Sequence, residues 1–443
     1  MKTPIYDFVN KYAEKDNIRM HMPGHKGAGN IEKYDITEIG GADSLYEAGG
    51  IIKESEENAS LLFGADTFYS AEGSSLSIRA MIRLITLYAK ETGKEPTILA
   101  SRNAHKVFVS AVALLGTRVE WMYGNADSYL SADLNADDVE RAILSLPEPP
   151  TAVYLTSPDY LGNMLDIGAI STVCKKHGVL LAVDNAHGAY LKFLKNSLHP
   201  MDLGADICSD SAHKTLPCLT GAAYLHISKN APAVLRENAK DALALFGSTS
   251  PSYLILSSLD KANGYLAGEF RAELLSLTEK LDSLKKSLTD LGYTLYGNEP
   301  MKITVKAKPY GYYGYSLSEI LNSLGVIHEF ADRDFLTLMP STRTTDEELS
   351  RILDAFASIK KRDAIEETAP RQVVATAAMT MREAILSPTE QIKTTEALGR
   401  VLGAITVGCP PAVPIIVSGE IADENAIRAF EYYGIEKIKV IKK

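Results

Sequence analysis

The sequence predicts an α/β fold with a mostly parallel sheet, and three observations predict it. Short apolar runs alternate with amphipathic segments from Ile51 to about Lys229. Hydrophobic residues make up 46% of the 443 residues and charged residues 23%, the balance of a folded globular protein. Polar residues follow several of the apolar runs directly. Strand–helix alternation at this spacing is typical of a parallel sheet that is covered by helices on both faces.

The strands and helices of this region are predicted from the periodicity of its apolar residues. Apolar runs that end in polar or turn-forming residues predict buried strands. The predicted strands are Thr97–Ala100, Val119–Tyr123, Ala152–Leu155, Val179–Val183, Asp206–Cys208 and Ala222–Ile227. Apolar residues at helical spacing predict helices near Ser75–Lys90, Ala104–Leu115 and Ile167–His177.

The segments on either side of this region have different patterns. Residues 1–50 are rich in glycine, with HMPGHKGAGN and IGGADSLYEAGG, and we expect an arm with turns. A long helix is predicted from about Leu259 to Leu291, with leucines at 274, 277, 281, 284, 288 and 291. A coiled coil has the same spacing but needs about three or four heptads, so we expect the leucines to pack on the core.

The last third of the chain predicts two smaller units. Strand-like runs occur at Lys302–Ala307 and Phe335–Met339, and capping residues that begin at Ser341 predict a helix. Lys360–Gln372 is charged, contains Pro370 and predicts a linker. We therefore expect an arm at 1–50, a large domain at 51–290, a small α+β domain at 291–365 and a C-terminal domain at 366–443.

Charge and composition argue against several classes of function. There are 46 Lys and Arg against 56 Asp and Glu, a net charge of −10, whereas a nucleic-acid binder presents a basic face. No apolar run reaches the roughly 18 residues of a membrane span. The four cysteines form no CxxC pair, and the N-terminal MKTPIYDFVNKYAEKDN has no signal-peptide core. We expect a cytoplasmic protein that binds neither nucleic acid nor membranes.

Common catalytic signatures are absent from the sequence. GxxxxGK[ST], GxGxxG, HExxH, GxSxG and metal-spaced sets of Cys and His do not occur, so no metal is expected. The remaining candidates are polar residues just after strands, at the edge where open parallel sheets bind ligands. Asp184 directly follows Val179–Val183, and a turn-forming aspartate is the simpler alternative. Lys214 follows Asp206–Cys208, where a solvated loop lysine is the alternative.

Two further candidates lie at predicted helix starts. Gly73, Ser74 and Ser75 begin a helix, and the N–H groups at a helix start bind phosphate. A simple serine N-cap is the alternative. His105 follows a strand in the run SRNAHK, where its imidazole can stack on a planar ligand. A histidine that is hydrogen-bonded to the helix backbone is the alternative.

Together these candidates match the contacts of one cofactor. A phosphate cradle, a flat imidazole, an acid and a lysine occur in this order, each at the end of a strand or the start of a helix. Pyridoxal phosphate needs a lysine for its aldehyde, an acid for its pyridine nitrogen and a helix start for its phosphate. An imidazole can cover one face of its ring. The sequence therefore predicts a pyridoxal phosphate site.

The motifs around these residues resemble those of the Orn/Lys/Arg decarboxylases, pyridoxal-phosphate-dependent enzymes of fold type I. The motifs are His21-Met-Pro-Gly-His-Lys-Gly27, Ser101-Arg-Asn-Ala-His-Lys106, Ser211-Ala-His-Lys-Thr-Leu216, Ser250-Pro-Ser-Tyr-Leu254 and Cys409-Pro-Pro-Ala-Val-Pro-Ile-Ile-Val-Ser-Gly-Glu420. The resemblance covers nearly the whole chain. It implies an aspartate aminotransferase-like large domain that binds the cofactor, smaller α+β domains, and the short form of the family without an N-terminal wing domain.

The resemblance also implies a role for each matching residue. Lys214 would bind the cofactor covalently, Asp184 would face its pyridine nitrogen and His105 would stack on its ring. Thr249 and Ser250 would reach the phosphate of a neighbouring subunit, because the family builds its sites at a homodimer interface. The remaining cofactor contacts would come from Gly73, Ser74, Ser75, Ala186, His187, Ser211 and His213.

The sequence departs from the family pattern within some of these motifs. Asn185 follows the ring-nitrogen acid where Glu is frequent, and Glu72 precedes the phosphate glycine where Asn is frequent. Asp159 stands where Thr is common. The terminal motif has Pro410-Pro-Ala412 and Ser418-Gly-Glu420 in place of PPG and PGE. None of these changes removes the lysine or the acid that the chemistry needs.

The implied reaction is the loss of CO2 from a basic L-amino acid, with lysine, arginine and ornithine all left open. Lys214 or a nearby histidine would return a proton to Cα. A cationic substrate side chain needs an acid partner, since burying an unpaired charge is costly. The candidate acids, each of which is otherwise a solvated surface residue, are Asp43, Glu47, Asp159 and Glu420.

Two other functions remain open from the sequence. A pyridoxal phosphate aminotransferase shares the lysine and the acid but needs an arginine for the α-carboxylate. Arg343 is a candidate for that arginine, although a surface arginine beside a helix is simpler. A non-catalytic regulatory relative is the third reading, and the intact Lys214 and Asp184 argue against it.

Overall fold

The computed structural model describes residues 1–124, 128–372, 374–409 and 413–443. Its residues form two compact units that interleave along the chain. Unit 1 comprises residues 1–99, 140–157 and 167–272, and unit 2 comprises 100–139, 158–166 and 273–443. The domain boundaries that the sequence suggests at 50, 290 and 365 stay a prediction.

The main sheet has seven strands in the order β1-β7-β6-β5-β4-β2-β3. Strands β4, β5 and β6 pair in parallel, whereas β7 runs antiparallel to both β6 and β1. The predicted α/β class is thus confirmed, although the sequence did not indicate β1. The strands are β1 (Asp66–Ser70), β2 (Thr97–Ser101), β3 (Arg118–Met122), β4 (Ala152–Thr156), β5 (Leu180–Asp184), β6 (Ile207–Asp210) and β7 (Ala223–Ile227).

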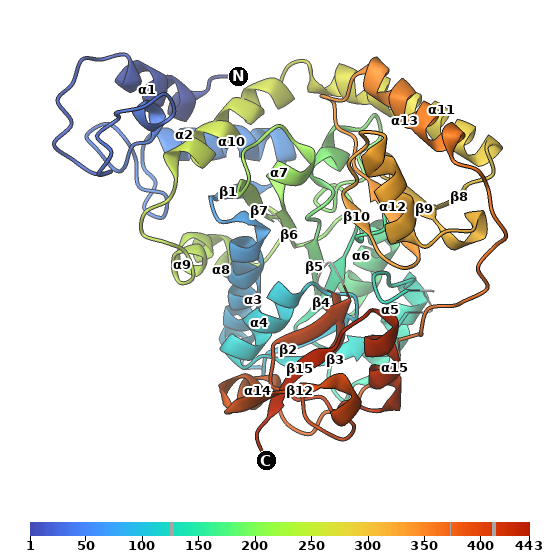
Figure 1. The fold of residues 1–443 in the computed structure, drawn as a ribbon. Helices are drawn as coiled ribbons and strands as arrows, with labels where there is room; N and C mark the ends of the chain where they lie inside the picture. Colours follow the sequence, from blue (N-terminus) through green and yellow to red (C-terminus); the bar gives the residue numbers. More distant parts are fainter. Residues whose placement is uncertain (125–127, 373, 410–412) are drawn as a thin grey trace. The chain divides into compact units, whose positions relative to one another are not determined.

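The helices of unit 1 include one in the segment that we expected to be an arm with turns. Helix α1 (Pro4–Ala13) buries Ile5 and Val9 and lies beside α2 and α10 (Figure 1). A carboxylate oxygen of Asp260 accepts hydrogen bonds from the N–H of Ile5 (2.8 Å) and of Tyr6 (2.9 Å). The other helices are α2 (Ile51–Phe63), α3 (Gly73–Glu91), α6 (Ile167–Lys176), α7 (Ala212–Thr215), α8 (Ala233–Glu237), α9 (Ala239–Ala244), α10 (Tyr253–Leu266), and the short 3-10 helices η1 (Glu32–Tyr34) and η2 (Ala189–Phe193).

The long helix predicted at 259–291 is wrong, because the structure has two helices there. Helix α10 ends at Leu266 and α11 (Phe270–Asp290) begins after a break that contains Gly268, a poor helix former. The leucine stripe lies on α11 up to Leu288, and Leu291 follows the helix end. Its members are buried within this chain, as expected for core packing rather than a coiled coil: Leu274, Leu277, Leu281, Leu284 and Leu288.

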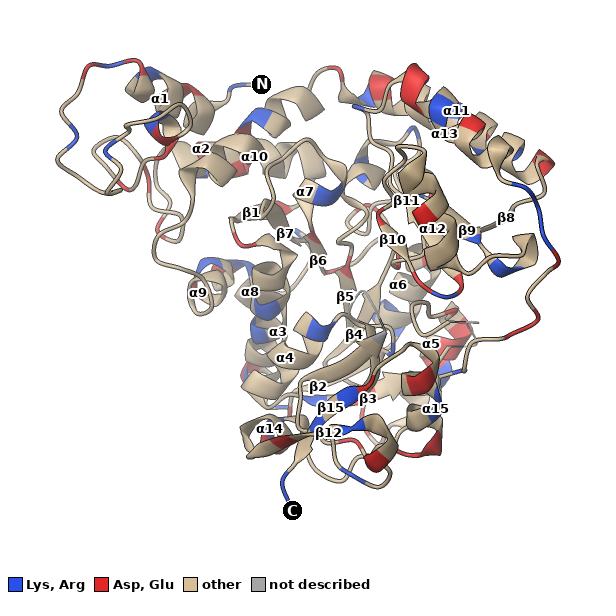
Figure 2. Cartoon of the chain, in the orientation of Figure 1, with Lys and Arg blue, Asp and Glu red and all other residues tan. Residues whose placement is uncertain are grey.

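A four-stranded antiparallel sheet forms one part of unit 2, in the order β10-β11-β9-β8. Helix α13 (Asp346–Ser358) begins with a capping box between Thr345 and Glu348, which confirms the predicted helix start. Figure 2 shows acidic and basic residues interspersed along α11 and α13, as on solvent-facing helix surfaces. The remaining elements are β8 (Thr294–Tyr296), β9 (Ile303–Lys306), β10 (Phe330–Ala331), β11 (Phe335–Leu338), α12 (Gly314–Ser323) and η3 (Lys308–Tyr310).

The C-terminal part of unit 2 has two antiparallel strand pairs, β12 with β15 and β13 with β14. They share a buried core that includes Leu402, Ile416, Phe430 and Val440. Residues 410–412 of the terminal motif lie outside the described residues. The elements of this part are α14 (Met381–Leu386), β12 (Thr389–Lys393), η4 (Thr394–Glu396), β13 (Thr406–Cys409), β14 (Val413–Val417), α15 (Glu424–Tyr432) and β15 (Lys437–Ile441). Helix α4 (Lys106–Leu115) belongs to an earlier segment of unit 2.

Helix α5 (Ala136–Ser145), like α11, has residues in both units. In the part of the chain that the structure describes, no helix has the length and apolar composition that a membrane crossing requires.

Candidate active site

Asp184 is the last residue of β5, at the carboxyl edge of the sheet, as the apolar run before it predicts. Its residue surface is only 2% exposed. Oδ1 accepts a hydrogen bond from the N–H of Ala186 (3.2 Å), and Oδ2 accepts one from the hydroxyl of Tyr154 on β4 (3.3 Å). The carboxylate is therefore held by the turn that follows it and by the neighbouring strand.

The charge state of Asp184 depends on opposing effects. Burial raises the pKa of Asp184, while the positive charge of Lys214 and the hydrogen bonds from Ala186 and Tyr154 oppose that rise. A second cation beside the carboxylate would lower its pKa further by direct attraction. The site therefore favours a positively charged partner for Asp184.

Lys214 belongs to the short helix α7, just after β6, rather than to a loop. Its Nζ lies 3.0 Å from Nε2 of His187, which comes from the turn after β5. Two residues that are 27 positions apart in sequence thus meet at the strand ends. The structure places Lys214, His187 and Asp184 in one region of unit 1.

The start of α3 lies in the same unit and is lined by polar side chains. Gly73 has φ of 72°, in the left-handed region that glycine tolerates best. The hydroxyl of Ser211, just before α7, donates to the hydroxyl of Ser74 (2.7 Å). A Cβ added to Gly73 would lie 4.0 Å from Cε1 of His213. Hydroxyl, imidazole and helix-start N–H groups therefore converge here, which is the donor set of an anion site.

His105 belongs to unit 2, where it is the N-cap residue of α4. Its Nδ1 accepts a hydrogen bond from the N–H of Val107 (3.2 Å), which is the backbone-bonded arrangement that the sequence left as an alternative. Stacking of His105 on a cofactor ring stays a prediction.

Thr249 and Ser250 are exposed in the segment between α9 and α10. The N–H of Ser248 donates to a carboxylate oxygen of Glu72 (2.6 Å), the residue just before Gly73. Glu72 therefore holds this segment instead of facing an anion. Contact of Thr249 and Ser250 with a second subunit stays a prediction.

The structure gives partners within the chain to three of the four candidate substrate acids. Asp43 accepts backbone N–H bonds at the start of α2. Asp159 is buried and accepts N–H bonds from Leu161 and Asn163, both at 2.9 Å. A substrate role for these two acids therefore stays a prediction and would require them to exchange existing partners.

Glu420 is also buried and is paired with a cation of its own unit. Its Oε2 accepts from Nη2 of Arg102 (2.7 Å) and from the N–H of Val417 (2.8 Å). Glu47 is exposed at the surface of unit 1. Arg343, the candidate carboxylate clamp of an aminotransferase, is an exposed residue 3.9 Å from Glu273. This surface pair matches the simpler interpretation of Arg343.

A comparison with known protein families identifies the family of this chain. Residues 3–307 match the family described as Orn/Lys/Arg decarboxylase, major domain. The chain belongs to this family. Membership makes it an amino acid decarboxylase of the pyridoxal-phosphate-dependent class, and it confirms the resemblance that the sequence motifs carry.

Relatives of this decarboxylase span almost the full chain. It is 29% identical to the uncharacterized protein YaaO of Bacillus subtilis, over 97% of this chain and 93% of that protein. It is 27% identical to an arginine decarboxylase of the same organism, over 96% of this chain and 92% of the relative.

Solved structures support the same fold. The lysine decarboxylase A of Pseudomonas aeruginosa aligns with a TM-score of 0.81 at 16% identity, covering 99% of this chain and 80% of that one. The constitutive lysine decarboxylase of E. coli aligns with a TM-score of 0.77 at 17% identity, over 100% of this chain and 82% of that one. The predicted fold type I of the large domain is thus confirmed.

The sequence patterns did not reveal two features of the candidate site. Tyr154 reaches Asp184 because β4 and β5 pair in parallel with Thr156 opposite Asp184. A tyrosine inside an otherwise apolar strand was the available signal. Asp210, at the end of β6, binds the side chain of Asn185, and the acid that precedes the SAHKTL motif was the signal for it.

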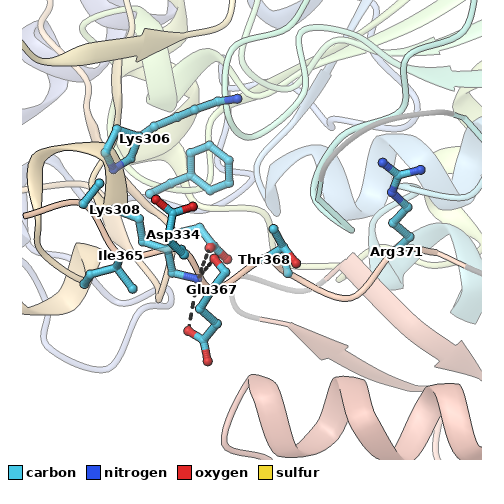
Figure 3. A pocket seen from close by; sticks show the side chains of 12 residues that line it. Lys306, Lys308, Asp334, Ile365, Glu367, Thr368 and Arg371 are labelled. Atoms are coloured by element: carbon cyan, nitrogen blue, oxygen red, sulfur yellow. Dashed lines mark hydrogen bonds and ion pairs between the residues drawn. The ribbon is translucent and has the colours of Figure 1, made fainter.

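A cavity of about 650 Å³ lies in unit 2 of the decarboxylase and is drawn in Figure 3. Its charged wall contains Lys308, whose Nζ lies 2.8 Å from Asp334 and 3.2 Å from Glu367. Because both carboxylates form ion pairs with the ammonium group of Lys308, this wall is a structural ion-pair cluster. The residues that line this cavity are all different from the predicted site residues.

Proposed function

We propose that this decarboxylase removes CO2 from lysine, arginine or ornithine and forms cadaverine, agmatine or putrescine, with pyridoxal phosphate as its cofactor. The observation that carries the proposal is the group at the strand ends of unit 1, with Nζ of Lys214 3.0 Å from His187 and Asp184 buried nearby. Relatives named arginine decarboxylase and lysine decarboxylase support basic amino acids as the substrates.

The residues of unit 1 fit the cofactor by their chemistry. An amine is available at Lys214 for the aldehyde, and a buried carboxylate at Asp184 for the pyridine nitrogen. The cradle of Gly73, Ser74 and Ser211 offers N–H and hydroxyl donors for a phosphate group. The other proposed cofactor contacts come from Ser75, Ala186, His187, His213 and, by stacking, His105.

Bound pyridoxal phosphate supplies an electron sink for the negative charge that is left on Cα when CO2 departs. The task of Asp184 is to keep a positive charge on the pyridine nitrogen, because its buried carboxylate stabilises a neighbouring cation. Tyr154 and Ala186 hold the carboxylate in place for this task. Asp184 thus acts electrostatically rather than by transferring a proton to Cα.

The return of a proton to Cα falls to Lys214 or His187 in this proposal. Their nitrogens are 3.0 Å apart, so a proton passes between them along one hydrogen bond. Lys214 would hold the cofactor covalently through Nζ, and the same amine would serve as a proton carrier once a substrate is bound. His187, buried beside it, is the second proton carrier.

Recognition of the substrate side chain and the subunit arrangement are also proposals. A basic side chain needs a carboxylate, and the candidates remain Asp43, Glu47, Asp159 and Glu420. We propose a homodimer in which exposed Thr249 and Ser250 complete the phosphate site of the partner subunit.

The test is product identification with purified protein, added pyridoxal phosphate and a panel of lysine, arginine and ornithine. The proposal predicts CO2 and the matching amine from at least one of them, and no product from Lys214→Ala. Lys195→Ala, in the same unit, is the control and should leave product formation intact. A keto acid in place of CO2, or no product from any of the three with cofactor bound, would contradict the proposal.

A further inference from the structure

The sheet face opposite Asp184 carries a buried polar network. Consecutive strand residues point to opposite faces, so Asn185 faces away from Asp184. Asp184 pairs with Ser209 in the register of β5 and β6, which puts Asp210 on the same face as Asn185. Nδ2 of Asn185 donates to Oδ1 of Asp210 (2.7 Å), and neither residue is exposed. The residue after Asp184 is thus tied to the next strand.

Two histidines hold Asp210 from its other side. Oδ2 of Asp210 lies 2.9 Å from Nε2 of His199 and 3.2 Å from Nε2 of His226. The N–H of Met201 donates to Nδ1 of His199 (3.3 Å), so His199 carries its proton on Nε2 and donates it to Asp210. These distances are within hydrogen-bond range, so Asp210 and the two histidines form a hydrogen-bonded network.

Asp210 is charged despite its burial. Burial alone would raise the pKa of Asp210, but the two histidines outweigh it and hold the pKa well below its usual range. A charged acceptor makes a stronger hydrogen bond than a neutral one. The hydrogen bond from Asn185 to Asp210 is therefore charge-assisted.

Backbone hydrogen bonds connect Asn185 to the turn that carries the site residues. The N–H of Asn185 donates to the carbonyl of Ser209 (2.9 Å), and the N–H of Gly188 donates to the carbonyl of Asn185 (2.8 Å). A Cβ on Gly188 would collide with Oδ1 of Asn185. Ala186 and His187 lie inside this turn, so the position of Asn185 sets where both of them stand.

We infer that Asn185 and Asp210 are a positioning pair that fixes the strand end and turn from which Asp184 and His187 reach the cofactor. The inference rests on the proposed function, because it assigns these two residues to the cofactor site. Asn185 and Asp210 lie on the far face of the sheet, and Asn185 reaches the site only through the backbone. Their loss therefore displaces Asp184 without removing a contact to substrate or cofactor.

The test uses Asn185→Ala and two readouts, the dissociation constant of pyridoxal phosphate from the cofactor-free protein and steady-state kinetics. We expect about tenfold weaker cofactor binding and about tenfold lower kcat, with KM for the amino acid within about twofold, because small displacements of a charged group are costly. Asn263→Ala is the matched control, an equally buried asparagine in unit 1 that binds Tyr69 and Tyr224. It should leave both readouts unchanged.

A double-mutant cycle separates positioning from general loss of stability. Because Asn185 acts through Asp184 and His187, adding Asn185→Ala to the double variant Asp184→Ala and His187→Ala should weaken cofactor binding no further. A purely structural role predicts an equal loss in both backgrounds and would overturn the inference. If Asn185→Ala does not fold, Asn185→Ser, which keeps a hydroxyl donor, is used in the same cycle.

The outcomes also separate this inference from the proposed function. If Asp184→Ala weakens cofactor binding and Asn185→Ala does not, the positioning pair is wrong and the proposed function stands. If Asp184→Ala has no effect on cofactor binding or kcat, the proposed site fails and the inference falls with it.

Discussion

Burial and a neighbouring cation together determine the charge state of Asp184. Its pKa is raised by burial and pulled down by Lys214, so a cation beside it determines whether it is charged. Asp184→Ala should lower kcat about 100-fold or more, since removing one preorganised electrostatic contact has this effect. Asp16→Ala, at an exposed position of the same unit, is the control. Nearly full turnover of Asp184→Ala with cofactor bound would contradict the assignment.

Gly188 is a residue whose small size has a specific reason. Its backbone is not in the left-handed region, but a Cβ there would strike Oδ1 of Asn185. Gly188→Ala should reduce the free energy of unfolding by about 1–3 kcal/mol, the usual cost of overpacking a core. Gly40→Ala, where a Cβ meets open space, is the control in urea unfolding. Equal free energies of unfolding for the two variants would contradict this prediction, because the turn would then accommodate a Cβ at residue 188 without cost.

The backbone N–H groups at the start of α2 are hydrogen-bonded by a residue that lies well before the helix in sequence. Asp43 accepts the N–H groups of Gly50 (2.7 Å), Ile52 (3.0 Å) and Lys53 (3.3 Å), which would otherwise lack partners at the helix start. Burial alone would raise the pKa of Asp43, but hydrogen bonds from the backbone N–H groups of Gly49, Gly50, Lys53 and Ser44 outweigh it and lower the pKa. Asp43 is therefore a distant N-cap, which a local sequence pattern does not reveal.

The lowered pKa of Asp43 predicts a pH-dependent stability. A carboxyl with a depressed folded pKa stabilises the fold fully above its unfolded pKa of about 3.9, and this contribution is lost as the pH falls through the folded pKa. Asp43→Asn should thus cost about 1 kcal/mol at pH 7 and progressively less toward pH 3 in urea titrations. Asp16→Asn is the control. A cost that is the same at both pH values would contradict the assignment.

The sequence predicted the elements that carry strong local patterns. Strand β5 is an uninterrupted apolar run, and α13 begins with a complete capping box, so both were located correctly. Strand β1 lies at the edge of the sheet and was missed, because its sequence DTFYS is mostly polar and has neither an apolar run nor a regular alternation. The break between α10 and α11 was missed because apolar residues at helical spacing, Leu266, Phe270 and Leu274, continue across Gly268.

The candidate site was predictable only as far as motifs extend. Lys214, Asp184 and the start of α3 were found from residues that adjoin them in sequence. Tyr154 and Asp210 were not assigned a role, because their contacts depend on the register of neighbouring strands. Register is set by the packing of the whole sheet, and no short window of sequence contains it.

The proposed dimer can be tested by mixing subunits that carry different substitutions. If Thr249 and Ser250 complete the site of the partner, a subunit with both changed to Ala still carries an intact Lys214. Mixing it with Lys214→Ala subunits should restore activity above the sum of the two parents, because hybrid dimers contain one complete site. No gain, despite hybrid dimers seen by native mass spectrometry, would show that each subunit builds its own site.

The most direct test of the account is the location of the cofactor bond. The protein is loaded with pyridoxal phosphate, reduced with borohydride, digested and mapped by mass spectrometry. We expect a phosphopyridoxyl group on Lys214. The group should be lost in Lys214→Ala and kept in Lys195→Ala. A label on another lysine, or none on a protein that has bound the cofactor, would contradict this expectation.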